Sequence, residues 1–115
     1  MGFSRAVRVG RNVFVAGTSP IMPDGGEPPS DAYGQATRCL DIIRMALEEA
    51  GAGLRHVVRT TVYLASADAS EGVGRAHGEA FREVRPVSTM VVVDRLLDPR
   101  WMVEISADAV IHDES

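Results

Sequence analysis

Two neighbouring hydroxyl side chains, Ser88 and Thr89, follow Pro86 and precede a run of apolar residues. Two hydroxyls in this position can hydrogen-bond a small ligand. They can equally mark the start of a strand, because serine and threonine are frequent where they can hydrogen-bond the local backbone. Further along, Glu104 is the first acidic residue of a run in which polar and apolar residues alternate. A carboxylate there is either a solvated strand residue or part of a site.

A histidine and a glutamate, His77 and Glu79, match the first half of the zinc deaminase signature. The second half, Pro-Cys-x-x-Cys, is absent, and Cys39 is the only cysteine of the chain. We therefore predict no metal site and no other cofactor, and we expect Cys39 to be a small buried residue of a helix. All twelve basic residues are arginine, which excludes Schiff-base chemistry and a P-loop lysine.

The composition is that of one soluble globular domain. With 115 residues the chain is long enough for one hydrophobic core and too short for two, so we predict a single domain over residues 1–115. The formal net charge of −4 provides no basic surface for phosphates, which argues against a nucleic-acid partner. No apolar run is long enough to cross a membrane, and a single cysteine fits a reducing compartment, so we expect a cytoplasmic protein.

The first half of the chain predicts a hairpin, a loop and a helix. Residues 4–9 and 12–17 are short apolar runs with a glycine between them, which is typical of two strands joined by a tight turn. Residues 20–29 hold four prolines and two adjacent glycines, so we predict a loop. Over residues 32–50 apolar side chains recur at steps of three and four, which predicts a helix capped by Asp31 and ended by the glycines that follow.

The second half predicts two further strands after a strand and a helix. Residues 57–65 are rich in β-branched and aromatic side chains, which favours a strand. Residues 68–84 have apolar residues at helical spacing, although three glycines each cost about 1 kcal/mol against alanine, and we predict a second helix that Pro86 ends. Residues 89–93 form a continuous apolar run, typical of a strand covered on both faces. Residues 102–111 alternate and predict a strand with one buried face.

The predicted order is strand, strand, helix, strand, helix, strand, strand. This order favours a single-domain α+β sandwich of two layers, with both helices on one face of the sheet. Two helices cover only one face, whereas residues 89–93 direct apolar side chains to both. The uncovered face needs a partner, and we expect a second copy of the chain to supply it.

The spacing of several residues resembles that of the Rid (YjgF) family of enamine/imine deaminases over nearly the whole chain. The positions concerned are Gly17, Gln35, Ala50, Gly51, residues 60–63, Pro86 and Glu104. The resemblance implies a chorismate-mutase-like fold and a homotrimer whose sheets line a central barrel, with a small-molecule cleft between neighbouring subunits. It also implies that Glu104 is catalytic and positions the hydrolytic water.

The other site residues of that family differ in this chain. The substrate-binding arginine of the family falls at Ser88, beside Thr89. The family's tyrosine, serine, asparagine and cysteine fall at Phe3, Ala16, Gly74 and Met90. By the same resemblance Gly17 and Val87 also line the cleft. Such a lining suits an uncharged or more apolar ligand.

The change from arginine to Ser88 exchanges a planar, charged fork of donors for a single neutral donor. We expect this change to weaken binding of an amino-acid-derived imine by a few kcal/mol, roughly one hundredfold or more. Standard deamination of 2-aminoacrylate is therefore not expected. Arg75 and His77, in the second predicted helix, can supply the lost cation, or they can be solvated residues of a glycine-rich helix.

Two functions remain open at this point. The first is a homotrimer that hydrolyses a reactive enamine or imine to a carbonyl compound and ammonia through Glu104 and a water. The second is a non-catalytic ligand-binding or scaffold trimer in which Glu104 is structural. The endoribonuclease activity sometimes attached to the family needs a basic surface that a net charge of −4 does not indicate.

Overall fold

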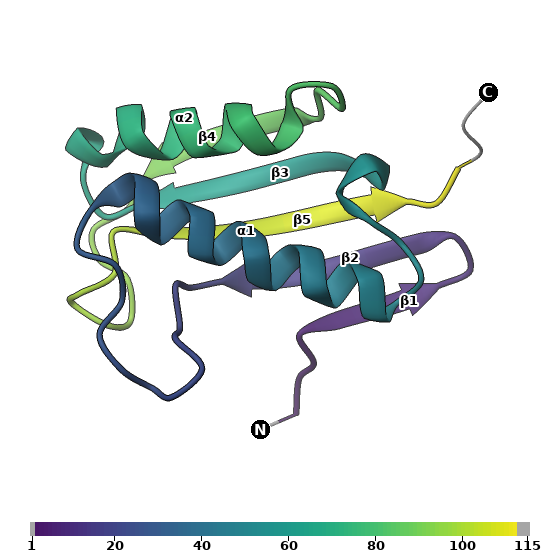
Figure 1. Cartoon of the computed structure of the whole chain (residues 1–115), viewed down its shortest axis with the longest axis horizontal. Coiled ribbons are helices and arrows are strands. Elements are labelled where there is room, and N and C mark those ends of the chain that lie inside the picture. Colours follow the sequence, from purple (N-terminus) through teal and green to yellow (C-terminus); the bar gives the residue numbers. More distant parts are fainter. Residues whose placement is uncertain (1, 113–115) are drawn as a thin grey trace.

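The structure is a computed structural model, and it describes residues 2–112. Its elements in chain order are β1 (Ala6–Val9), β2 (Asn12–Thr18), α1 (Ala32–Glu49), the short helix η1 (Leu54–His56), β3 (Val57–Leu64), the short helix η2 (Ala67–Ala69), α2 (Ser70–Phe81), β4 (Val87–Val92) and β5 (Val103–Val110). The predicted order of strands and main helices is confirmed. Figure 1 shows both main helices on one face of a single sheet.

The five strands form one mixed sheet in the order β1-β2-β5-β3-β4. β4 runs parallel to β3, and the other neighbouring strands are antiparallel. β5 lies in the middle, and its side chains alternate between fully buried and half-buried, as predicted. The buried ones face the helices and belong to the hydrophobic core. We call this side of the sheet the helix face and the other side the open face.

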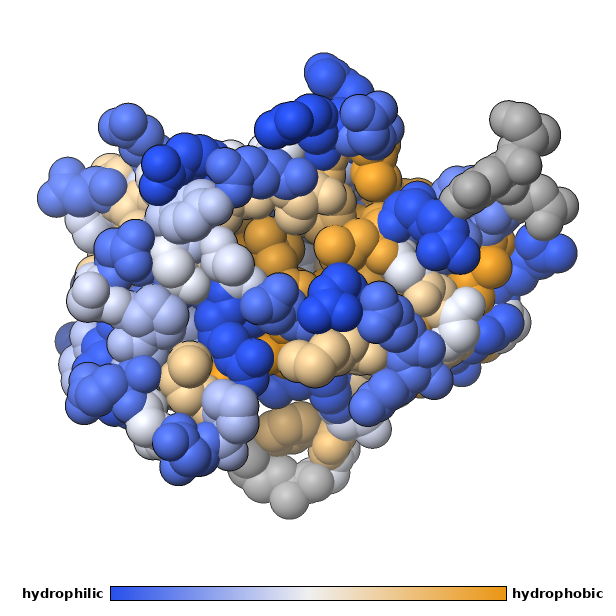
Figure 2. Space-filling model, viewed as in Figure 1, coloured by the Kyte–Doolittle hydropathy of each residue, from blue (hydrophilic) through white to orange (hydrophobic). Residues whose placement is uncertain are grey.

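α1 packs on β2 and β5 and lies beside α2. Cys39 is among its buried residues, as predicted. Asp31 occupies the N-cap position, but the expected capping bond is wrong: its carboxylate lies over Gly34 and accepts no cap hydrogen bond. At the other end Gly51 has φ +85, a conformation that glycine adopts freely, and it ends the helix as predicted. Figure 2 shows apolar side chains between the two helices, surrounded by polar ones.

α2 is shorter than the sequence predicts. Residues 67–69 form η2, and α2 ends at Phe81, well before Pro86. A turn over residues 82–84 joins the last helical residue to the segment that precedes the proline. The amide nitrogens of Val84 and Arg85 donate to the carbonyl oxygen of Phe81 at 3.1 and 2.9 Å, and Arg85 has φ +56. These contacts close a turn that redirects the chain into β4.

β4 is an edge strand, and all of its residues are exposed in the single chain. The sequence predicts cover on both faces, and within one chain this prediction is wrong, because neither helix packs closely against β4. The apolar character is still present on both faces. Val87 and Val91 lie on the open face, and Met90 and Val92 lie on the helix face. Within residues 2–112, nothing covers this strand.

Candidate functional site

Glu104 lies on the open face of β5, beside the end of β2. The hydroxyl of Ser19 donates to its Oε1 at 3.0 Å. Among the described residues, no other hydrogen bond or ion pair reaches this carboxylate, and the side chain is half-buried. A carboxylate held by one neutral donor keeps lone pairs on Oε2 for a further hydrogen bond. Such a group can hold a water and take a proton from it.

A bulge in β2 makes room for this carboxylate. The register of β2 against β5 shifts between Val15 and Thr18. Gly17 lies within the bulge, and a Cβ at this position would lie 2.5 Å from Glu104 Oε2. The φ of Gly17 is not in the positive region, so space and not backbone conformation requires a glycine here. The bulge and its glycine therefore set where Oε2 lies.

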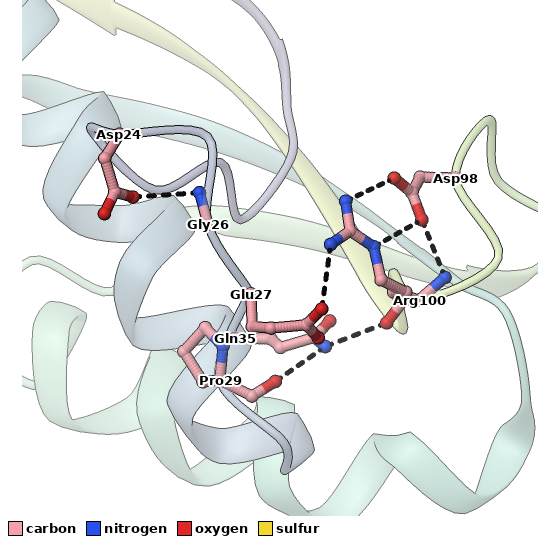
Figure 3. A network of polar contacts seen from close by, with 7 residues as sticks. All are labelled: Asp24, Gly26, Glu27, Pro29, Gln35, Asp98 and Arg100. Atoms are coloured by element: carbon pink, nitrogen blue, oxygen red, sulfur yellow. Dashed lines mark hydrogen bonds and ion pairs between the residues drawn. The ribbon is translucent and has the colours of Figure 1, made fainter.

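Gln35, a buried side chain of α1, fixes the start of β5. Its Nε2 donates to the carbonyl oxygens of Pro29 at 2.9 Å and Arg100 at 3.0 Å, and its Oε1 accepts from the amide of Met102 at 2.7 Å. Figure 3 shows the two donor contacts beside the ion pairs that Arg100 forms with neighbouring loop carboxylates. Because Met102 precedes Glu104 by two residues, this clamp positions the strand that carries the carboxylate.

Residues near the N-terminus accompany Glu104. Phe3 is 72% exposed and precedes Arg5 by two residues. The amide of Ala16 donates to the carbonyl oxygen of Arg5 at 2.9 Å, and Arg5 Nη1 donates to the carbonyl oxygen of Gly17 at 3.2 Å. The structure thus brings the predicted residue Ala16 beside Gly17 and Glu104, whereas the exposed Phe3 forms no contact with them that would test its predicted role. It adds a guanidinium that the sequence interpretation missed.

Ser88 belongs to a chain of three side chains near the opposite edge of the sheet. Thr60 Oγ1 lies 2.8 Å from Ser88 Oγ and 2.8 Å from His77 Nε2. Thr60 is buried, His77 is half-buried against the ring of Phe81, and Ser88 is exposed. Burial lowers the pKa of His77 from 6.5, so the imidazole is neutral at pH 7. A neutral imidazole adds no positive charge beside Ser88.

A surface hollow of about 370 Å³ borders the same histidine. Its lining residues are His77, Gly78, Phe81, Arg82, Arg85 and Pro86. Within residues 2–112, the guanidinium groups of Arg82 and Arg85 form no hydrogen bond or ion pair. The surroundings of Ser88 thus combine a neutral hydrogen-bond chain with two solvated guanidinium groups.

Glu104 and Ser88 do not meet within one chain. Ser88 pairs with Thr60, whose side chain is buried on the helix face, whereas Glu104 pairs with Tyr63 on the open face. β3 separates the two strands that carry them. We name the two groups the Glu104 half-site (Gly17, Ser19 and Glu104) and the Ser88 half-site (Thr60, His77 and Ser88).

The remaining predicted site residues are divided over the molecule. Met90 shares the helix face of β4 with Ser88, whereas Val87 and Thr89 point to the open face. Arg75 lies apart from both half-sites. Its guanidinium stacks over a tyrosine ring of α1 at 4.1 Å from the ring centroid. Arg75 therefore has a structural contact on the surface of the helix. Its role in ligand binding stays a prediction.

The sequence interpretation missed Thr60 and Ser19 as site residues. Thr60 had a usable signal, because strand alternation places it on the buried face, where a hydroxyl must find a partner. Ser19 had no such signal, since it contacts a carboxylate 85 positions away along the chain. Only the packed fold brings Ser19 and Glu104 together.

Residues 1–111 match the protein-family model described as Endoribonuclease L-PSP. A solved structure from Mycobacterium tuberculosis, described as a member of the highly conserved YjgF family, is 42% identical, with a TM-score of 0.87 over 96% of this chain and 87% of that one. The chain belongs to the YjgF/RidA family. The 2-iminobutanoate/2-iminopropanoate deaminase of Escherichia coli is 30% identical over 112 residues, which cover 94% of this chain and 86% of that protein.

The structure of the Escherichia coli YjgF gene product has 29% identity to this chain and a TM-score of 0.88, over 96% of this chain and 88% of that one. The single-domain α+β sandwich predicted from the sequence is thus the fold of the YjgF/RidA family. Among residues 2–112, no cluster of histidine, cysteine and acidic side chains could hold a metal ion. None of the described helices has the length and apolar character needed to cross a membrane.

Proposed function

We propose that this chain is a divergent hydrolase of the YjgF/RidA family. It is a cytoplasmic homotrimer that binds a small, uncharged ligand between subunits and hydrolyses a reactive enamine or imine to a carbonyl compound and ammonia. The observation that carries the proposal is the Glu104 carboxylate, whose Oε2 has no partner among the described residues and lies against Gly17. The iminobutanoate deaminase of Escherichia coli provides the reaction class by similarity.

Imine hydrolysis needs a base for water and protons for the leaving nitrogen. Glu104 takes a proton from water as the water oxygen bonds to the imine carbon. The C=N π electrons move to nitrogen, which takes the proton back from Glu104, and a carbinolamine results. Glu104 then accepts the hydroxyl proton of the carbinolamine and passes it to the nitrogen, so that the C–N bond breaks, the C=O bond forms and ammonia leaves. One water is consumed, and Glu104 ends ionised as it began.

The placement of the half-sites supports a cleft between subunits. Because one chain holds them on opposite faces of the sheet, a ligand can touch both only where two chains meet. Exposed apolar side chains on the strands offer the contact surface: Val7, Val9, Phe14, Val87, Met90, Val91 and Val92. Sedimentation should give three times the chain mass of 12.4 kDa. A monomer at micromolar concentration would refute the cleft.

Ser88 supports the choice of an uncharged ligand. It offers one neutral hydroxyl where the family has an arginine, and the neutral imidazole of His77 adds no charge. Arg82 and Arg85 border the neighbouring hollow and are the alternative source of positive charge. Comparing 2-oxobutanoate with its neutral amide as ligands separates these cases. Tighter binding of the amide supports the proposal, and tighter binding of the acid assigns recognition to the arginines.

The hydrolase is tested with imines formed in situ. An amino-acid oxidase generates 2-iminobutanoate from 2-aminobutanoate, and an amine oxidase generates a neutral imine from a primary amine. We expect the protein to accelerate release of the carbonyl compound, most strongly for the neutral imine. Glu104→Gln should reduce the acceleration about 10²- to 10⁴-fold. Ser106→Ala, on the same face of β5, is the matched control. If all imines decay at the buffer rate with the wild type, the hydrolase is excluded.

The alternative is a non-catalytic ligand-binding trimer, which the changed Ser88 half-site favours. Ser88→Arg distinguishes it from a hydrolase of altered specificity. Activity of this variant on 2-aminoacrylate would show that the Glu104 half-site is catalytically competent and that only recognition has changed. An inactive but folded, trimeric Ser88→Arg protein, together with an inactive wild type, would support the binding function.

A further inference from the structure

The hydrogen bonds of Thr60 restrict the protons of its two neighbours. A hydroxyl has one proton to donate, and Thr60 Oγ1 is within hydrogen-bond distance of both Ser88 Oγ and His77 Nε2. When Thr60 donates to Ser88, Nε2 of His77 must carry a proton and donate it to Thr60. Ser88 then keeps its own proton for an acceptor outside the chain of three residues.

The three residues connect a half-buried titratable group to an exposed hydroxyl. Thr60 is 1% exposed, so water does not compete for its hydroxyl. Ser88 is the exposed end of the chain of bonds, whereas His77 is half-buried. In a poorly hydrated setting, consecutive hydrogen bonds polarise one another and strengthen the terminal donor. A neutral serine backed in this way is a better and more directional donor than an isolated one.

We propose that His77 is a positioning residue. Through Thr60, it holds the Ser88 hydroxyl as an outward-pointing donor, which binds a carbonyl oxygen or an imine nitrogen of the ligand. This inference rests on the proposed function for the nature of the ligand. It assigns the recognition that the family places in an arginine to a neutral three-residue chain. It also assigns a single tautomer to His77, with the proton on Nε2.

The tautomer is tested without any ligand. Long-range proton–nitrogen NMR on histidine-labelled protein distinguishes Nε2–H from Nδ1–H, and a His77→Gln sample identifies the signals of His77. We expect one tautomer, Nε2–H, in the wild type and in Thr60→Ser. Thr60→Val keeps the β-branched shape and removes the hydroxyl, so it should release the ring into a mixture. The control Thr61→Val, on the other face of β3, should leave the tautomer unchanged. A wild-type Nδ1–H tautomer would overturn the proposal.

Binding of 2-oxobutanamide, measured by calorimetry, tests the effect on Ser88. Thr60→Val, which no longer orients the Ser88 hydroxyl, and Ser88→Ala, which removes it, should each weaken binding about five- to tenfold. Thr60→Ser keeps a hydroxyl at position 60 and should bind with the wild-type affinity. Equal affinity in Thr60→Val and Thr61→Val would overturn the positioning role. Absence of binding in the wild type would refute the proposed ligand class, and the NMR result would still decide whether His77 orients the chain.

Discussion

The two half-sites are built in different ways. In the Glu104 half-site the backbone sets the geometry, through a β-bulge, a glycine without room for a Cβ, and a clamp at the start of β5. In the Ser88 half-site, side-chain hydrogen bonds at an edge strand set the geometry. The backbone geometry of the Glu104 half-site allows few substitutions, whereas the side chains of the Ser88 half-site can be substituted one residue at a time. Under the proposed function, this difference would allow the carboxylate to be kept while the residues around Ser88 change.

Gly17→Ala should break the Glu104 half-site while leaving the Ser88 half-site intact. The new Cβ would lie 2.5 Å from Glu104 Oε2, so the carboxylate must move. A displacement of about 1 Å at a catalytic group costs about a hundredfold, and we expect imine turnover to fall by that factor or more. Stability should change by less than about 1 kcal/mol, because the displaced atom is the end of a flexible side chain. Turnover assays and urea unfolding measure the two effects, and unchanged turnover would show that Oε2 does not act in the reaction.

Gln35→Ala tests how far the Glu104 half-site depends on its clamp. The variant loses three hydrogen bonds and leaves three backbone groups without their buried partner. We expect a loss of about 2 kcal/mol in unfolding free energy, measured with urea. Asp41→Ala, on the same helix, is the control and should change it by less than about 0.5 kcal/mol. The His77 tautomer should be unaffected. A change at His77 would mean that the half-sites are coupled through α1.

Gly74→Ala, in the helix that carries His77, should raise the unfolding free energy, whereas Gln35→Ala should lower it. This glycine lies inside α2, and no heavy atom lies within 4 Å of a Cβ added there. Alanine favours helix by up to about 1 kcal/mol over glycine, so the variant should be more stable by up to that amount. Thermal or urea unfolding checks the prediction. A destabilised variant would show that this position of α2 is packed against another chain.

The sequence was most informative about the Glu104 half-site and least about the Ser88 half-site. The alternation of β5 predicted that Glu104 faces away from the core, because its neighbours in sequence are buried. The face of Ser88 was not predictable, since β4 carries apolar residues on both sides and its alternation has no polar face. The clamp of Gln35 was also hidden, because its partners are backbone groups, one of them 67 positions away. The end of α2 was misplaced because Pro86 is a visible stop signal, whereas the turn at Arg85 is not.

The pH dependence of stability provides the smallest effect and concerns the Ser88 half-site alone. The unfolded chain protonates His77 near its ordinary pKa of 6.5, whereas burial lowers the pKa in the folded chain. Below neutral pH the unfolded state therefore binds more protons than the folded state. The contribution of His77 to the unfolding free energy decreases as the pH is lowered, by less than about 1.4 kcal/mol per pH unit. His77→Gln removes this contribution. Urea unfolding at pH 7 and pH 5 should show a smaller acid loss in the variant than in the wild type. An equal loss in both would place a charged imidazole in the folded protein, and the hydrogen-bond chain to Ser88 would then begin from a cation.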